Sequence, residues 1–207
     1  MCGRYVVTNA VTKTKGLVKS AIQIEDNENY NAHPYQNLPV IKKYTNGSAL
    51  EKLKWGIVPS WSKKKDFKPL INSRLETIDE KISFKKLIKL KRCIAIADGF
   101  YEWKRTEKEK KPFFFQREDK KIIYFAGIYD ENEFCLITEQ ASENVLEIHH
   151  RQPVILNQKD LKSYLDLQLD GSAFLKEAKK PRLGFYEVSK DVNKPTNNSI
   201  SLIQSLN

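Results

Sequence analysis

The sequence predicts an α+β fold, in which a single domain is built on a largely antiparallel β-sheet or barrel with peripheral helices. The first observation is a run of strand-like segments from residue 93 to residue 138, joined by connections that carry clusters of charge. The second is Asn46-Gly47 between two strand-like segments, which is a strong β-hairpin signal. The third is that helical patterns are few and short, so strands dominate.

The length of the chain fits one domain. It has 207 residues, which allows a sizeable core, and it shows no internal repeat, low-complexity block or linker. We therefore expect a single domain over residues 1–207, with a polar tail rich in Asn and Ser from about residue 190 to residue 207.

The individual elements follow from local patterns. Strand-favouring composition predicts strands at residues 4–8, 40–44, 50–58, 93–103, 112–117, 122–129, 133–138, 154–156 and 183–189. A weak apolar stripe predicts a helix at residues 12–22. Thr77 and Glu80 form a capping box, which predicts a helix to about residue 91. Two short helices are expected at residues 160–167 and 172–179, and residues 30–39 are expected to be irregular.

The charge balance favours a polyanionic partner. Lys and Arg total 36 against 26 Asp and Glu, a net charge of +10, and the pI of about 9.3 points to nucleic acid. No apolar stretch approaches the roughly 20 residues that span a bilayer, and the N-terminus carries no secretory signal. Three cysteines without CxxC spacing fit a reducing compartment. We expect a cytoplasmic protein with no membrane partner.

Cys2 is the most informative residue, because it follows the initiator Met1 directly. Removal of Met1 would place a thiol and a free α-amine on one residue. Such a 1,2-aminothiol condenses with an aldehyde to an imine, and the thiol then closes a five-membered thiazolidine ring. The amine has an ordinary pKa of about 7.7 to 8.0, and the ring closure is intramolecular and therefore fast. A cysteine at this position without any role is the plain alternative.

Asn72, Arg74 and Glu76 alternate along one segment, so an extended backbone would project all three from one face. An amide could orient a nucleophile, a guanidinium could bind phosphate, and the carboxylate could brace the arginine. A solvent-exposed strand face, with Glu76 only as a helix-start carboxylate, explains the same pattern.

Three further side chains are candidates for a site. Glu102 lies between aromatic rings after an apolar strand, where desolvation would raise its pKa toward the range of a general acid or base. His149 and His150 are adjacent, so at most one of them reaches a given site from a strand. Trp61 precedes a run of lysines and could stack on a base.

No His, Cys and carboxylate set has the spacing of metal ligands, so no metal is expected.

These blocks together resemble the SOS-response-associated peptidase (SRAP) family, the abasic-site processing proteins that crosslink to abasic sites in single-stranded DNA. The blocks stand in family order and cover essentially the whole chain. Gln152 departs from the Met that the family usually has, and His150 stands beside the motif histidine, His149. The matching blocks are residues 1–5, 55–61, 72–77, 97–103, 125–128, 149–156, 188–189 and 192–193.

The resemblance implies a mechanism for the DNA damage response. Met1 leaves, by self-processing or through an aminopeptidase, and Cys2 captures the ring-opened deoxyribose as a thiazolidine. Asn72 is implied to orient Cys2, and Glu102 with His149 to transfer protons. A lyase-type side reaction through the imine is also implied.

The resemblance further implies that Arg4 and Arg74 hold phosphates and that Trp61 stacks or wedges beside the lesion. The implied partner is single-stranded DNA that contains abasic sites, and no cofactor or metal is implied. We expect a monomer that associates with the nucleoid when it is bound to DNA.

Two other functions fit part of the sequence. An N-terminal-nucleophile amidohydrolase, such as a glutamine amidotransferase domain, also begins with Cys-Gly, but there apolar residues usually follow, whereas Arg4 follows here. A non-catalytic single-strand-binding module explains the positive charge and Trp61, but it gives Cys2 no role.

Overall fold

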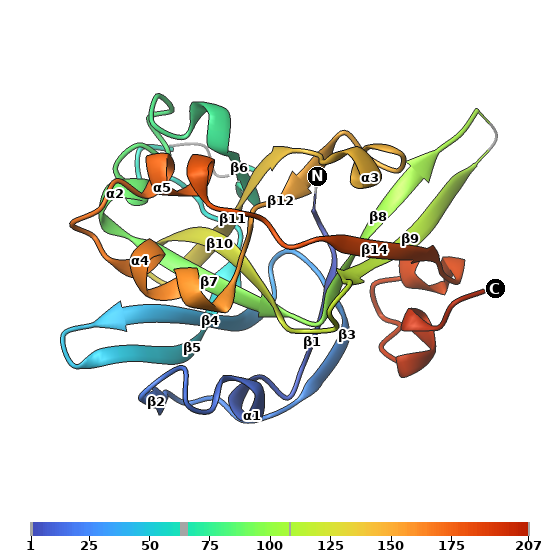
Figure 1. Cartoon of the computed structure of the whole chain (residues 1–207), viewed down its shortest axis with the longest axis horizontal. Coiled ribbons are helices and arrows are strands. Elements are labelled where there is room, and N and C mark those ends of the chain that lie inside the picture. The colour runs from blue at the N-terminus through green and yellow to red at the C-terminus, as the bar shows by residue number, and fades with distance from the viewer. Residues whose placement is uncertain (1, 63–65, 108, 207) are drawn as a thin grey trace.

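The computed structural model describes residues 2–62, 66–107 and 109–206, and its strands form two sheets (Figure 1). The larger, nine-stranded sheet contains β2 (Ser20–Ala21), β4 (Asn37–Tyr44), β5 (Gly47–Trp55), β6 (Asn72–Arg74), β7 (Arg92–Ala97), β10 (Ile123–Asp130), β11 (Glu133–Gln140), β12 (Arg151–Pro153) and β13 (Ile155–Leu156). The five-stranded sheet contains β1 (Tyr5–Thr8), β3 (Glu28–Ala32), β8 (Gly99–Arg105), β9 (Lys110–Arg117) and β14 (Leu183–Glu187).

The larger sheet closes into a barrel. Its main path runs β12-β11-β10-β7-β4-β5-β2. β5 also pairs with β11 in parallel, through Lys54 with Glu133 and Trp55 with Phe134. The strands β11, β10, β7, β4 and β5 therefore form a ring, and closure leaves the ring without a free edge. β6 pairs with β11 beyond this contact, so the ring also fixes the position of Asn72.

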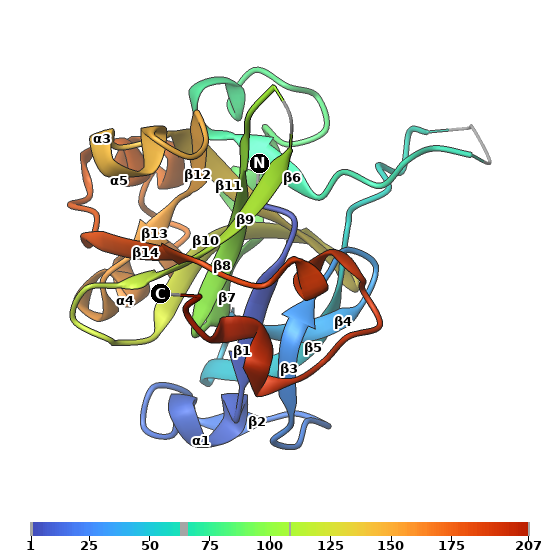
Figure 2. The same cartoon turned by 90° about the vertical axis from the view of Figure 1, so that its right-hand side faces the viewer.

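The smaller sheet runs β14-β9-β8-β1-β3, and all its pairings are antiparallel. Only Asp98 separates β7 from β8, so one continuous segment passes from the barrel into the smaller sheet. Figure 2 shows β1 between β8 and β3. The residues just before β1 border β8, because the amide of Tyr101 donates to the carbonyl of Arg4, whereas β3 ends at Ala32, opposite Tyr5.

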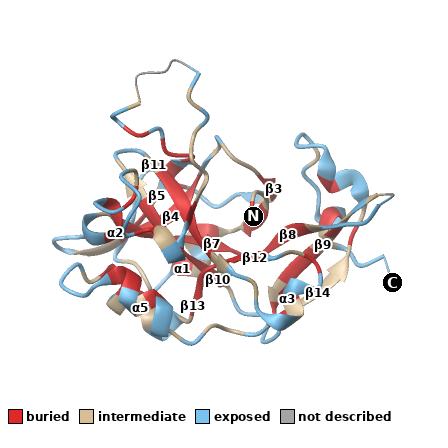
Figure 3. Ribbon diagram, turned by 90° about the horizontal axis from the view of Figure 1, so that it is seen from above, coloured by how far each residue is buried: buried red, intermediate tan, exposed pale blue. Residues whose placement is uncertain are grey.

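Aromatic rings join the two sheets. The Tyr5 ring on β1 lies 5.1 Å from the Trp55 ring and 5.7 Å from the Phe125 ring, both on the barrel. Phe100 stacks on Phe115 at 5.0 Å within the smaller sheet and meets Phe125 edge-on at 5.9 Å. All five side chains are fully buried, and Figure 3 shows buried residues concentrated along the strands. Such aromatic burial dominates the stability of a core of this kind.

The helices are short and peripheral (Figure 1). They are α1 (Ala10–Thr14), α2 (Leu87–Leu90), α3 (Glu143–Leu146), α4 (Leu161–Leu165) and α5 (Gly171–Glu177). Within the described residues, no helix combines the length and apolar character that crossing a membrane requires.

The C-terminal segment returns to the smaller sheet. It contains the 3-10 helices η3 (Lys190–Asn193) and η4 (Ile200–Ile203), and it buries Val192 and Leu202 against Val6, Tyr101 and other side chains of that sheet. Despite its polar composition, this segment contributes two side chains to a second apolar cluster.

The predicted α+β class with a largely antiparallel sheet core is confirmed, and so is the hairpin at Asn46-Gly47, which joins β4 to β5. The helix predicted at residues 12–22 is wrong, because α1 ends at Thr14 and Gly16 takes a positive φ of 86°. Residues 30–39 contain most of β3 and the start of β4 rather than irregular chain.

The long helix predicted after Thr77 is also wrong. Residues 75–77 form the 3-10 helix η1 (Leu75–Thr77), turns follow, and only α2 is α-helical. Ile78 is fully buried, whereas Ile82 is 69% exposed, yet a continuous helix would place residues four apart on the same face. Burial of Ile78 with exposure of Ile82 does not fit one helix through both residues.

We predict that Gly99→Ala destabilises the fold. A Cβ at Gly99 would lie 2.2 Å from Cζ of Phe114 and 2.5 Å from the carbonyl oxygen of Phe115. Overpacking of this kind costs about 1 to 3 kcal/mol, and each kcal/mol lowers Tm by about 2 to 4 °C in a chain of this size. Thermal unfolding measures the loss. Gly184→Ala is the matched control, because its nearest neighbour would lie 3.8 Å away; equal Tm values for both variants would contradict the prediction.

Candidate active site

Cys2 is buried directly before β1, and its backbone is held in place. Its side chain is 0% exposed, and its carbonyl oxygen accepts a 2.8 Å hydrogen bond from Nδ2 of Asn72 on β6. Burial raises the pKa of the Cys2 thiol strongly, and the charge of Glu102 raises it further. The thiol is therefore neutral in this setting.

Glu102 reaches Cys2 from the neighbouring strand. Tyr5 of β1 pairs with Phe100 of β8, and the amide of Tyr101 donates to the carbonyl of Arg4 at 2.9 Å. Because the strands are antiparallel, residues before Arg4 run toward Glu102. Glu102 is only 3% exposed, and burial raises the pKa of its carboxyl group.

His149 lies against Glu102, with 4.0 Å between its Nε2 and the carboxylate Oε2. Its Nδ1 lies 3.0 Å from the backbone nitrogen and 3.1 Å from the carbonyl oxygen of Arg151, so the backbone of Arg151 can pair with either tautomer and orients the ring with Nε2 facing Glu102. Partial burial lowers the pKa of His149 and favours its neutral form.

The structure therefore brings Cys2, Asn72, Glu102 and His149 together. They come from the N-terminal segment, β6, β8 and the loop before β12, and a surface depression of about 380 Å³ opens beside them. That depression is lined by Trp103, Arg105, Leu146, Ile148, His149 and His150. A buried thiol, a carboxyl group with a raised pKa and a neutral imidazole form a set suited to proton transfer at a nucleophile.

Arg151 supports this set, and the sequence analysis missed it. Its Nη1 and Nη2 donate to the two carboxylate oxygens of Glu76 at 2.6 and 2.9 Å, and Nη2 also donates to the carbonyl of Thr138 at 2.8 Å. Glu76 thus braces Arg151 rather than Arg74, and it also lies in the first turn of the 3-10 helix η1. The available signal was the position of Arg151 next to a motif histidine, but the long-range pairing with Glu76 cannot be read locally.

The two expected phosphate-binding arginines differ in their surroundings. Arg74 is exposed at the end of β6, and its guanidinium group makes no hydrogen bond or ion pair within the described part of the chain. Arg4 is half-buried, and its Nη1 donates to Oδ1 of Asn31 at 2.6 Å and to the carbonyl of Val192 at 2.8 Å. Burial lowers the pKa of Arg4. Arg4 therefore ties β1 to β3 and to the C-terminal segment.

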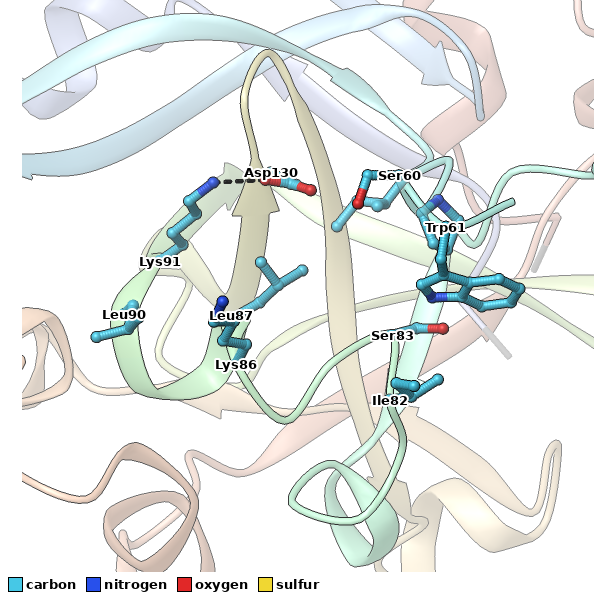
Figure 4. A pocket seen from close by; sticks show the side chains of 11 residues that line it. Ser60, Trp61, Ile82, Ser83, Lys86, Leu87, Leu90, Lys91 and Asp130 are labelled. Atoms are coloured by element: carbon cyan, nitrogen blue, oxygen red, sulfur yellow. Dashed lines mark hydrogen bonds and ion pairs between the residues drawn. The ribbon is translucent and has the colours of Figure 1, made fainter. Parts of the chain in front are cut away.

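Trp61 is 51% exposed and stands in a separate pocket (Figure 4). Its ring meets Phe67 edge-on at 5.9 Å. The pocket holds about 330 Å³, and its walls include Ile82, Ser83 and Lys86 but none of the four site residues. Trp61 is thus available to a ligand from a surface of its own.

The described residues include no cluster of three His, Cys, Asp or Glu side chains that could hold a metal ion.

Comparison with known proteins identifies the family. The family model "SOS response associated peptidase (SRAP)" matches residues 1–195. The chain belongs to the SRAP family. Abasic site processing protein YoqW of Bacillus subtilis (strain 168) is 34% identical over 223 residues, which cover 99% of this chain and 100% of YoqW. Abasic site processing protein YedK of Escherichia coli (strain K12) is 29% identical, with 99% of each chain covered.

Other SRAP relatives extend beyond bacteria. Abasic site processing protein HMCES of Gallus gallus is 32% identical over 82% of this chain and 64% of its own length. The fold also matches a crystal structure of a protein from Bacteroides thetaiotaomicron, with a TM-score of 0.82, 23% identity and 99% of each chain covered. The fold is therefore shared with this solved structure over nearly the full chain.

We predict that Glu102→Gln stabilises this SRAP protein at neutral pH. A carboxyl group whose pKa is raised in the fold adds stability below its unfolded pKa of about 4.3, and that contribution is lost as pH rises through the folded pKa. The neutral amide avoids this loss, so the Tm of the variant should exceed that of the wild type at pH 8 and approach it near pH 4. Glu147→Gln, at an exposed position, is the control. A variant that is less stable at pH 8 would refute the expectation.

Proposed function

We propose that this protein captures abasic sites in single-stranded DNA as a covalent thiazolidine adduct on Cys2, after removal of Met1 by the protein itself or by an aminopeptidase. The observation that carries the proposal is Cys2 buried beside the Glu102–His149 pair, with its carbonyl bound by Asn72. The names of the relatives, abasic site processing proteins, support the same substrate.

The proposed reaction balances without a cofactor. The Cys2 amine adds to C1′ of the ring-opened deoxyribose, and loss of one water gives the imine. The sulfur then adds to the same carbon, and the thiol proton passes to the imine nitrogen. Because the thiolate is the nucleophile, the sulfur must lose its proton as it attacks, and the imine nitrogen receives that proton as the ring N–H. The imine also allows elimination of the 3′ phosphate, so a lyase activity belongs to the proposal.

Glu102 and His149 are the proposed proton carriers. Burial raises the pKa of Glu102 and lowers that of His149, so the two pKa values move toward each other. Proton exchange between these groups, whose Nε2 and Oε2 lie 4.0 Å apart, then requires less free energy than exchange between groups at their ordinary pKa values. The pair can protonate the sugar oxygen during ring opening and accept protons from the Cys2 amine. Asn72 fixes the backbone of Cys2 and so the position of the nucleophile.

Single-stranded DNA is the proposed partner because the chain carries a net charge of +10 and Arg74 is exposed close to Asn72 on the same strand. Phosphate contacts give affinity without sequence preference, which suits a lesion in any sequence. Arg4 would serve mainly through the framework that it holds, with Trp61 stacking on a base farther along the strand. We further propose a cytoplasmic monomer that joins the nucleoid on DNA.

We predict that Cys2→Ala binds single-stranded DNA nearly normally but forms no denaturant-resistant adduct. The substitution removes the sulfur that closes the ring and leaves the phosphate-binding side chains intact. Intact mass after incubation with an oligonucleotide bearing one abasic site measures the adduct, and the expected gain is the oligonucleotide mass less one water. Failure of the trimmed wild-type protein to gain this mass would overturn the proposed function. Release of glutamate from glutamine would favour the amidohydrolase instead.

We predict that Arg74→Glu weakens binding to single-stranded DNA and flattens its salt dependence. Removing one phosphate-neutralising side chain reduces the slope of log K against log salt by about 0.7 for a single strand. Fluorescence anisotropy from about 50 to 200 mM salt measures both quantities. Lys162→Glu makes the same charge change at an exposed position on α4 and serves as the control. The same loss in both variants would show a net-charge effect and would remove the role assigned to Arg74.

A further inference from the structure

Tyr35 has a backbone conformation that is unusual for its residue type. It lies in the turn between β3 and β4, with a φ of +76°. Positive φ costs an L-residue about 1 to 2 kcal/mol, and a bulky residue adopts it rarely. Tyr35 is the one aromatic residue of this kind in the described ranges; the other non-glycine residues with positive φ are Asn9, Gln23, Lys120 and Glu131. Glycine would relieve the strain at this position.

The turn holds the Tyr35 ring in a defined and open place. The Tyr35 amide donates to the carbonyl of Trp55 at 2.8 Å, and the Trp55 amide donates to the carbonyl of Gln36 at 2.9 Å. A Cβ on Gly56 would lie 3.5 Å from two carbons of the Tyr35 ring, so the ring rests on bare backbone there. Even so, 48% of Tyr35 remains exposed. An aromatic side chain is therefore held rigidly with much of its surface in water.

Pairing of the neighbouring strands places Tyr35 beyond the end of β1 that leads to Cys2. Trp55, which binds the turn, has its ring 5.1 Å from that of Tyr5, and its Nε1 donates to the carbonyl of Ile71, which precedes Asn72. Tyr5 pairs with Ala32 on β3, and Figure 2 shows these two strands side by side. Because the pairing is antiparallel, the chain after Ala32 runs in the direction of Cys2.

We propose that Tyr35 stacks on a nucleobase that flanks the abasic site. The inference rests on the proposed function and extends it by one binding residue. An abasic nucleotide has no base, so its neighbours lose a stacking partner, and a rigid exposed ring beyond the Cys2 end of β1 replaces it. Stacking on aromatic side chains tolerates any base, because each base has a flat π face. The retained strain then has a functional reason, which is how such backbone outliers commonly arise.

The alternative is that Tyr35 only packs on Gly56 and stabilises the turn. The two explanations differ in the effect of glycine. Under the packing explanation, Tyr35→Gly removes stabilising packing and lowers Tm. Under the stacking explanation, the relief of strain offsets the removal of the ring, so Tm stays level or rises while DNA binding falls.

The experiment compares Tyr35→Gly, Tyr35→Ala and Tyr35→Phe in the full chain. Fluorescence anisotropy measures the Kd for an undamaged single-stranded oligonucleotide, and thermal unfolding measures Tm. We expect the Gly and Ala variants to bind on the order of tenfold more weakly, with the Gly variant unfolding at or above the wild-type Tm and above the Ala variant. The Phe variant should bind like the wild type, since stacking does not need the hydroxyl group.

Tyr44→Ala is the control, because Tyr44 is 41% exposed at the β4–β5 hairpin, and its replacement should leave DNA affinity unchanged. Wild-type affinity in the Tyr35→Gly variant overturns the inference. A Tm of Tyr35→Gly below that of the wild type, together with equally weakened DNA binding by Tyr35→Gly and Tyr35→Ala, also overturns it. Binding to undamaged DNA does not involve Cys2 chemistry. A wild-type protein that binds but never crosslinks would therefore reject the proposed function alone.

Discussion

The hydrogen bond from Asn72 to the carbonyl of Cys2 is the constraint on which the site depends. Chain termini are poorly ordered unless something ties them down, and here the second residue is fully buried. The 2.8 Å bond from Asn72, the amide of Tyr101 bound to the carbonyl of Arg4, and the packing of Tyr5 hold this end in place. Under the proposed function, removal of Met1 would leave the Cys2 α-amine free at this fixed position, which no internal residue can offer.

Closure of the barrel positions Asn72 so that it can donate to the carbonyl of Cys2. β6 has three residues, and it is positioned by pairing with β11. The same β11 pairs with β5 and with β12, whose first residue, Arg151, binds Nδ1 of His149. One strand thus sets the positions of Asn72 and His149, while β8 of the smaller sheet supplies Glu102. Residues far apart in sequence meet because the two sheets share a single packed core.

Local sequence patterns predicted the sheets and the site, and they failed where long-range interactions decide. The Asn46-Gly47 hairpin and the strands from residue 93 onward follow from composition and turn chemistry. The four residues gathered at the site were found from their chemistry and from the family resemblance. The capping box at Thr77 failed because Ile78 is buried while Ile82 is exposed, and one helix would place both on the same face. The pairing of Arg151 with Glu76 was missed because it joins segments 75 residues apart.

Burial of the Glu102 carboxyl group affects both the stability of the protein and the proposed proton transfer. Glu102 is only 3% exposed, so its ionised form lacks the hydration that it has in the unfolded chain. For this reason we expect ionised Glu102 to lower the stability of the free protein at neutral pH. Under the proposed function, arriving phosphates add negative charge near this group, and like charge raises a carboxyl pKa further. Substrate binding would then move Glu102 toward its protonated form, which is the form that can donate to the sugar oxygen. The acid would be generated only when DNA is present, and the neutral Cys2 thiol would keep its proton until the imine can receive it.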